Sequence, residues 1–207
     1  MRTGPQWLRT RSLAIAIAGG LLAVSFVPAL ADNTRHHLAI GLGYYELTSD
    51  QLHLHAFTLT GDDLGDIDLR TAGFGLVRYG YSLSKRVDLT FEGRGTLHKD
   101  SVPTIPSESS LKTWWIGPGV RVHFANEGFR PYAQASLYSV HEELKFGNDP
   151  ATSGSSIGFG VFAGADVTAT DMLSVPMEIG YTYGQPEHDV SGIGGSVGLA
   201  FNFGVLP

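Results

Sequence analysis

The sequence predicts an all-β fold, an eight-stranded antiparallel up-and-down β-barrel, and three observations support this prediction. Apolar and polar residues alternate with the two-residue period of β-strands along most of the chain. The segments that connect these stretches alternate between short and long along the chain. The 207 residues include 27 glycines, and one face of the alternating stretches is mostly Gly, Ser, Thr and Ala, which suits the narrow interior of a small barrel.

Residues 1–31 precede the alternating stretches and have the features of a secretory signal peptide. Three arginines lie near the start, residues 13–27 are apolar and uncharged, and Ala29-Leu30-Ala31 places small residues before a cleavage site. The apolar run is shorter than the roughly 20 residues of a spanning helix, although a retained anchor is the alternative. Cleavage before Asp32 would leave a barrel domain over 32–207. Its net charge would be −9, because three of the 14 basic residues and none of the 20 acidic ones are removed.

The first four predicted strands include the clearest example of the alternation. In residues 87–98, Leu89 and Phe91 are on one face, and Asp88 and Glu92 are on the other. The same period places strands at 38–47, 71–83 and 113–124.

The other four predicted strands follow the same rule. Residues 173–183 set Met177 and Ile179 against Glu178 and Gly180. Further strands are expected at 131–143, 156–167 and 196–203. A length of about ten residues is what a tilted strand needs to cross the hydrocarbon layer of a membrane.

The predicted connections alternate in length, which indicates the topology. The short ones are 84–86, 125–130 and 168–171, and the long ones are 48–70, 99–112, 144–155 and 184–192. Transmembrane β-barrels have short periplasmic turns and long outer loops. Both termini are therefore expected in the periplasm.

The apolar face is predicted to point outward, into lipid. A soluble barrel with the apolar face around a ligand is the alternative. The small residues of the polar face favour a narrow lumen, and aromatic residues near strand ends favour membrane–water interfaces. These aromatic residues are Tyr79, Tyr81, Phe124, Tyr181, Tyr183, Phe201 and Phe203.

The last predicted strand resembles the assembly signal of outer-membrane barrels. Ser196, Gly198, Phe201 and Phe203 match its polar residue, glycine and two aromatic residues, although residues 204–207 follow where such chains commonly end. The chain as a whole, with Gly73 to Tyr81 and Arg130 to Ala133, resembles the small bacterial outer-membrane barrels similar in plan to OmpA and OmpX. This resemblance implies an outer-membrane location, contact with lipid and lipopolysaccharide, and the barrel-assembly machinery as a partner.

With the apolar face outward, seven charged residues point into the lumen: Arg78, Asp88, Glu92, Arg94, Arg121, Asp166 and Glu178. Unpaired charges in a narrow interior are costly, so these residues are expected to form ion pairs across the lumen. Arg78 and Arg121 are the expected partners of acidic residues on other strands. Trp115, Tyr132 and Phe162 should fill further space. We expect a solid core, with a gated conduit as the alternative.

Three other groups of residues are candidates for chemistry. His53 and His55 precede Asp62, Asp63, Asp66 and Asp68, but their spacing does not fit a calcium loop, so a solvated acidic loop is expected instead of a metal site. Ser139, His141 and Glu143 share the outer face of one strand, where they would resemble a lipid A deacylase only in location. The alternative is a strand that rises above the membrane, or a bulge that turns Val140 outward. The remaining histidines are expected to be structural or solvated, with His98 and His123 inward, His36 and His37 before the first strand, and His188 in a loop.

Composition narrows the possible functions. The absence of cysteine excludes disulfides and cysteine-ligated zinc, and the acidic balance argues against nucleic acid as a partner. No cofactor or catalytic residue is expected. The sequence therefore predicts a monomeric, non-enzymatic outer-membrane barrel with a structural or surface-interaction role. The alternatives are a porin-like small-solute channel and a lipid A-modifying enzyme.

Overall fold

The computed structural model describes residues 36–48, 53–57, 63–100, 109–125, 128–145 and 151–203. The predicted signal peptide, residues 1–31, lies outside this part. No helix within the described ranges is long and apolar enough to cross a membrane.

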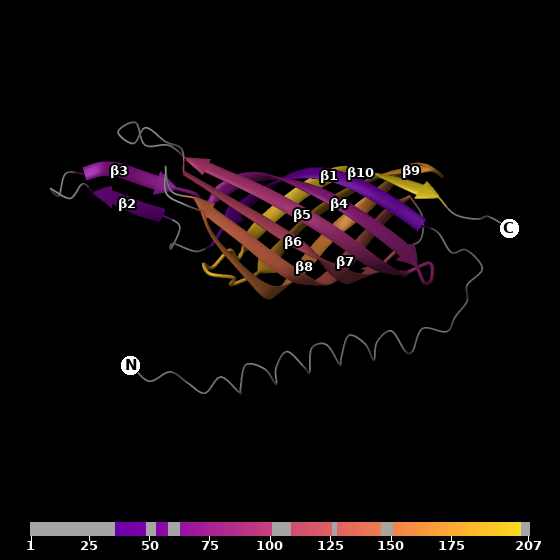
Figure 1. The fold of residues 1–207 in the computed structure, drawn as a ribbon. Coiled ribbons are helices and arrows are strands. Elements are labelled where there is room, and N and C mark those ends of the chain that lie inside the picture. The colour runs from indigo at the N-terminus through magenta and orange to yellow at the C-terminus, as the bar shows by residue number, and fades with distance from the viewer. Residues whose placement is uncertain are drawn as a thin grey trace. The chain divides into compact units, whose positions relative to one another are not determined.

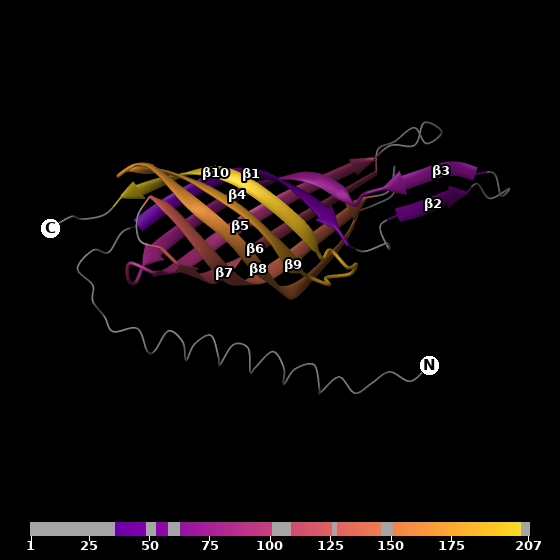
Figure 2. The same ribbon diagram turned by 180° about the vertical axis from the view of Figure 1, so that it is seen from behind.

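Eight antiparallel strands close into a barrel, which confirms the predicted fold (Figures 1 and 2). They are β1 (His36–Leu47), β4 (Thr71–Ser82), β5 (Val87–Asp100), β6 (Ser109–His123), β7 (Phe129–Lys145), β8 (Thr152–Thr170), β9 (Leu173–Tyr183) and β10 (Gly192–Phe203). Each strand pairs with its neighbour along the barrel, and β1 closes the sheet by pairing with both β10 and β4. We call the end that holds His36 and Phe203 the turn end and the opposite end the loop end.

Several strands are longer than the sequence predicted, and the extra residues lie mainly at the loop end. β6 starts at Ser109, β8 at Thr152 and β10 at Gly192, each four residues earlier than expected. Alternation weakens there because both faces become polar or glycine-rich. The hydrogen-bonded ladder nevertheless continues, since backbone pairing does not depend on that contrast.

A two-stranded sheet was not predicted. β2 (His53–Phe57) and β3 (Asp63–Asp68) pair antiparallel within the segment expected to be one long loop, 48–70. The side chains of the His and Asp residues that were candidates for a metal site here lie outside the described part.

The barrel has its apolar face outside. Leu42, Val77, Phe91 and Ile179 are each more than half exposed, whereas the alternate positions are buried in the lumen. Large buried side chains there include Trp115, Tyr132, Tyr138 and Arg78. This confirms the predicted orientation of the two faces and places a polar, crowded core inside the barrel.

Candidate functional site

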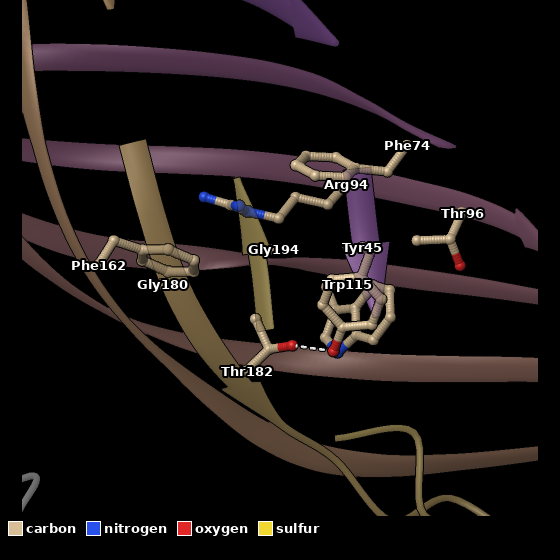
Figure 3. Close-up of a pocket in the computed structure, with 9 residues that line it drawn as sticks. All are labelled: Tyr45, Phe74, Arg94, Thr96, Trp115, Phe162, Gly180, Thr182 and Gly194. Carbon is tan, nitrogen blue, oxygen red and sulfur yellow. Dashed lines mark hydrogen bonds between the residues drawn. The ribbon is translucent and has the colours of Figure 1, made fainter. Parts of the chain in front are cut away.

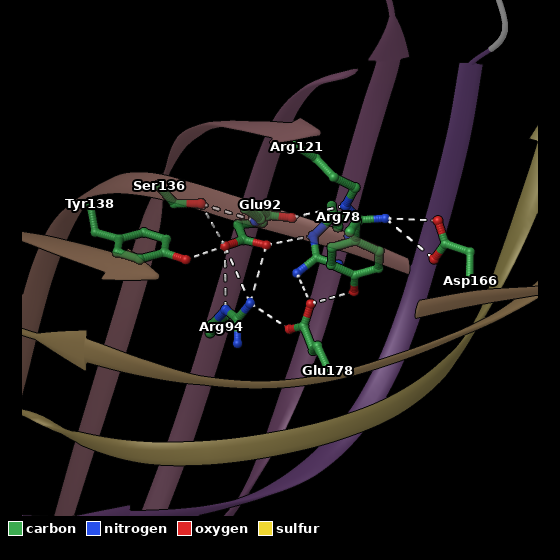
Figure 4. A network of polar contacts seen from close by, with 10 residues as sticks. Arg78, Glu92, Arg94, Arg121, Ser136, Tyr138, Asp166 and Glu178 are labelled. Atoms are coloured by element: carbon green, nitrogen blue, oxygen red, sulfur yellow. Dashed lines mark hydrogen bonds and ion pairs between the residues drawn. The ribbon is translucent and has the colours of Figure 1, made fainter. Parts of the chain in front are cut away.

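Four charged side chains form an ionic plug in the middle of the lumen: Arg78, Glu92, Arg94 and Glu178 (Figure 4). Arg78 on β4 is directly opposite Glu92 on β5, and its Nε lies 2.6 Å from Glu92 Oε2. Glu178 reaches across from β9, and its two oxygens lie 2.7 Å from Arg78 Nη2 and 2.6 Å from Arg94 Nη2. Strand parity turns all four inward, and two acids balance two bases.

Hydroxyl groups donate further hydrogen bonds to the two acids. Tyr132 donates to Glu178 Oε2 at 3.0 Å, Ser136 donates to Glu92 Oε1 at 3.2 Å, and the hydroxyl of Tyr138 also donates to Glu92. From the sequence, Tyr132 was expected in the lumen only as filling, and Ser136 and Tyr138 were not identified. The same parity on β7 that placed Tyr132 would have found them, since buried carboxylates need several donors.

One expected feature of the plug differs in detail. Glu92 and Arg94 were expected to find their partners on other strands, but Arg94 Nη2 also lies 3.4 Å from Glu92 Oε1 on the same strand. The contact is possible because residues two apart on a strand share a face, and a guanidinium group on a long side chain spans that spacing.

An aromatic layer lies next to the plug toward the loop end (Figure 3). The guanidinium carbon of Arg94 is 4.0 Å from the centre of the Phe162 ring and 5.8 Å from that of Phe74. Tyr45 and Trp115 pack beyond them with ring centres 5.3 Å apart. The cavity among these side chains measures about 10 Å³. It can hold about one water molecule.

A second group of buried polar contacts, centred on Glu142, lies still closer to the loop end. The buried carboxylate of Glu142 accepts the backbone N–H groups of Glu187 and His188, at 3.4 and 3.1 Å, and also contacts His188 Nδ1. Val190, in the same segment, is fully buried. Glu142 therefore holds the connection between β9 and β10 against the barrel. Its inward parity on β7 was the available sign in the sequence, but nothing there indicated its partners.

The turn end of the lumen is open and polar. Arg121 Nη1 lies 3.2 Å from Asp166 Oδ2, and the Arg121 guanidinium stacks over Tyr132 at 3.8 Å. Asp88 is directly opposite Arg121 in the ladder but pairs with His123 Nε2, at 2.8 Å. A cavity of about 470 Å³ adjoins these groups.

Some buried polar atoms of residues that line this turn-end cavity have no hydrogen-bond partner among the described residues. They include His37 Nε2, Asp88 Oδ1 and one terminal nitrogen of Arg121, and all three residues line the cavity. The cavity itself has a charged and polar lining and is large enough for several water molecules, so we expect it to be hydrated.

The structure places all seven predicted lumen charges inside the barrel, in two groups. Arg78, Glu92, Arg94 and Glu178 form the ionic plug, while Asp88, Arg121 and Asp166 border the turn-end cavity. His98 and His123 are buried, as expected by parity. His36 and His37 were expected before the first strand but form its first two residues, with His37 turned inward.

Ser139, His141 and Glu143 do not meet as a catalytic group in the described structure. They line one face of β7, where His141 Nδ1 bonds Ser155 Oγ at 2.9 Å and Glu143 Oε1 bonds Lys112 Nζ at 2.8 Å. Val140 is fully buried, so no bulge turns it outward. Glu143 lies beyond the outward-facing Trp114, above the apolar surface, and the hydrogen bond from Lys112 lowers the pKa of its carboxyl.

The residues of the predicted assembly signal lie on the strand that closes the barrel. Gly198 is opposite Gly41 of β1, and Ser196 is opposite Gly43. Phe201 and Phe203 point outward and are each 49% exposed, and Phe203 stacks on His36. Residues 204–207 lie outside the described part.

Comparison with known proteins gives a consistent result. Residues 16–203 match the family described as outer membrane protein beta-barrel domain. No curated protein matches the chain in sequence.

Three solved structures share the fold at low sequence identity. The attachment invasion locus protein Ail of Yersinia pestis, in complex with a heparin analogue, has a TM-score of 0.56 at 14% identity, covering 83% of this chain and 99% of Ail. Neisserial surface protein A has a TM-score of 0.56 at 14% identity, with coverages of 81% and 95%. OprG of Pseudomonas aeruginosa has a TM-score of 0.58 at 11% identity, with coverages of 84% and 98%.

Proposed function

Since the chain belongs to the outer membrane protein beta-barrel domain family, we propose that it is a non-conducting barrel with a structural or surface-interaction role. Its location is the bacterial outer membrane. The role is carried by the loop end, while the lumen serves as a stabilising core. The proposal includes export by residues 1–31, with Asp32 as the first residue of the mature chain, which N-terminal sequencing tests.

One observation carries this proposal, namely the filling of the lumen. The ionic plug and the aromatic layer follow one another along the barrel axis and leave a cavity of about 10 Å³ on the loop side of the plug. A path for a hydrated solute needs a continuous polar passage, and a space for about one water molecule does not provide it. Eight strands enclose just enough room for side chains, which supports the same conclusion.

The structural relatives support a surface role for this barrel in general terms, but not a particular ligand. One of them is named an attachment invasion locus protein, and another is named a surface protein. Each shares the fold at 14% identity, so the likeness does not extend to a particular ligand.

Planar-bilayer recording of the purified mature protein tests the proposal. We expect no stepwise conductance at neutral pH, whereas reproducible single-channel steps would contradict it. A known porin purified in the same detergent serves as the positive control for insertion.

A small-solute channel is the second candidate, and the turn-end cavity favours it. Its volume of about 470 Å³ and its charged lining, with Asp88, Arg121 and Asp166, would suit a hydrated entrance. Conduction would then require the ionic plug to rearrange, because the four charges would have to exchange partners to open a passage. Steps that appear only when the pH or the voltage is changed would support this candidate.

We propose that the barrel is not an enzyme. Ser139 and His141 lie on one strand face, and His141 is hydrogen-bonded to Ser155, which supports this view over a lipid A-modifying enzyme. Mass spectrometry of lipid A from cells with and without the protein tests it, and a protein-dependent change in acylation would contradict it.

A further inference from the structure

The turn-end cavity is closed on one side and open on the other. Among its lining residues, Ala39 on β1 is directly opposite Arg78 in the ladder. Pro176, also in the lining, is two residues from Glu178 on the same inward face of β9. The ionic plug therefore closes the cavity on its loop side. The volume of about 470 Å³ is in the range of small-ligand pockets, roughly 300–1,000 Å³.

Two cations that line the turn-end cavity have no acidic partner in the described structure. Asp166 is directly opposite Arg130 in the ladder, but its carboxylate pairs with Arg121 (Figure 4). Asp88, the other buried acid of the lining, is paired with a histidine. Within the described residues, neither Lys85 nor Arg130 forms an ion pair. We call Lys85 and Arg130 the unpaired cations.

The unpaired cations come from two neighbouring turns of the barrel. Lys85 is exposed in the turn between β4 and β5, and Arg130 is half-buried as the second residue of β7. Only β5 and β6 lie between these positions, so the long side chains can approach one group in the cavity. The remaining charged residue of the lining, Asp171, is exposed in the turn between β8 and β9. A ligand that enters the cavity therefore meets two cations that lack a partner.

Uncharged polar side chains line the part of the cavity formed by β8, β9 and β10. They are Thr168, Ser174 and Asn202. Hydroxyl and amide groups both donate and accept hydrogen bonds, so they suit the hydroxyl groups of a ligand. The cavity thus combines a cationic part with a neutral polar part, which is what a ligand with one anionic group and several hydroxyl groups requires.

We propose that the turn-end cavity is a binding site for a small phosphorylated polyol, with the phosphate on Lys85 and Arg130 and the hydroxyl groups toward Ser174 and Asn202. A phosphate monoester carries a charge of about −1.5 to −2 at pH 7, which matches two cations. The guanidinium group binds phosphate in a bidentate manner, and the ammonium group adds a point charge. The expected topology places the turn end in the periplasm, so the ligand is a periplasmic solute. This site goes beyond the proposed surface role, which lies at the opposite end of the barrel.

The test measures ligand binding to the purified, folded mature protein in deuterated detergent by saturation-transfer NMR. Glycerol phosphate is the probe, glycerol is the control ligand, and inorganic phosphate is the competitor. The test variants are Lys85→Gln, Arg130→Gln and the two combined. The matched control is Arg86→Gln, because Arg86 is an exposed neighbour of Lys85 that does not line the cavity. Heat-dependent gel migration confirms that each variant is folded.

We expect wild type to bind glycerol phosphate and not glycerol, with inorganic phosphate competing more weakly than unlabelled glycerol phosphate. Each single test variant should lose about 10-fold in affinity and the combined variant on the order of 100-fold, because charge-assisted hydrogen bonds are removed. Arg86→Gln should bind like wild type. Asp171→Asn should bind no more weakly than wild type, since it removes a carboxylate that would repel the phosphate.

Three outcomes would overturn the proposal: equal binding of glycerol and glycerol phosphate by wild type, an unchanged affinity in the combined variant, or an equal loss in Arg86→Gln. Inorganic phosphate that bound as tightly as glycerol phosphate would contradict the role of the hydroxyl groups. The bilayer recording is independent of these results. A conducting barrel whose turn-end cavity still bound glycerol phosphate would contradict the non-conducting role and leave the binding site intact.

Discussion

At the residue scale, Glu92 is the most connected charge of the ionic plug. It contacts Arg78 and Arg94 and accepts hydrogen bonds from Ser136 and Tyr138. Its side chain is fully buried. Removing the Glu92 carboxylate would leave two buried arginines with one acid, Glu178, to balance them. An uncompensated buried charge of this kind is strongly destabilising.

We therefore expect Glu92→Ala to lower the free energy of unfolding by about 3–5 kcal/mol. Glu92→Gln should have a smaller effect, because the amide oxygen still accepts hydrogen bonds. Urea unfolding in lipid vesicles, followed by tryptophan fluorescence, measures both.

Glu143→Ala is the matched control, since its partner Lys112 is an outward, solvent-exposed residue and the pair is 2.8 Å apart. Exposed pairs contribute little, so this variant should unfold close to wild type. A Glu92→Ala protein no less stable than Glu143→Ala would contradict the account of the plug.

Glycine at position 180 has a steric role. A Cβ atom there would overlap the ring of Phe162 and the carbonyl oxygen of Val161. At Gly75, on the outward face, an added Cβ atom would have nothing within 4 Å. Gly180 thus leaves the space in which Phe162 lies against Arg94.

Gly180→Ala is expected to destabilise the barrel by about 1–3 kcal/mol through overpacking, because the overlap includes backbone. Gly75→Ala should change stability by less than about 0.5 kcal/mol. Parallel urea titrations of the two variants make the comparison, and equal effects would show that the lumen is more loosely packed than described.

At the scale of elements, the pairing of β1 with β10 removes the last open edge of the sheet. The ladder runs from His36 opposite Phe203 to Leu47 opposite Gly192. An unpaired backbone polar group in hydrocarbon costs several kcal/mol, so this closure is obligatory for a barrel in a membrane.

Phe203 should matter for assembly, whereas residues 204–207 should not. Phe203 is the last residue of the ladder and stacks outward on His36. Deleting 204–207 should leave heat-modifiable protein in the membrane fraction, while Phe203→Ser should lower its amount, because an aromatic residue at the interface is lost. The opposite pattern would mean that the tail, and not the aromatic residue, is recognised.

The strands could be predicted where one face meets lipid and the other meets the lumen. In β5, Leu89 and Phe91 alternate with Asp88 and Glu92, so the period is strong. At the loop end this contrast disappears, as in the Gly192–Gly195 start of β10, and strand ends there were predicted four residues short. The β2–β3 sheet was missed for a different reason: its strands have only five and six residues, so their short alternating runs did not stand out from a loop.

For the lumen, parity predicted which charges point inward but not how they pair. Asp88 is opposite Arg121 in the ladder, yet it pairs with His123. Contacts across the lumen, such as Arg94 with Glu178, depend on barrel closure and side-chain reach. Neither of these can be obtained from the spacing of residues along one strand.

At the scale of the whole barrel, the lumen has a sequence of layers. The turn-end cavity is followed by the ionic plug, then by the aromatic layer, and at the loop end by the segment that Glu142 holds in place. Each layer takes side chains from several strands, so the layers also couple the strands to one another. This arrangement explains how a barrel can be polar inside and still closed.

The last prediction tests which layer closes the lumen. Arg94 and Glu178 are paired at 2.6 Å, and removing both leaves the charge balanced and the Arg78–Glu92 pair, also at 2.6 Å, in place. Arg94→Ala/Glu178→Ala deletes the guanidinium group that lies against Phe162 and the carboxylate that crosses from β9. The vacated space would join the small cavity of the aromatic layer to the hydrated turn end.

We expect this double variant to give small, brief conductance steps in planar bilayers in which wild type is silent. Phe162→Ala alone should remain silent, because it leaves the ionic plug complete. Heat-dependent migration must first show that both variants are folded. Steps in Phe162→Ala but not in the double variant would assign closure to the aromatic layer instead, and the ionic plug would then serve mainly to hold β4, β5 and β9 together across the lumen.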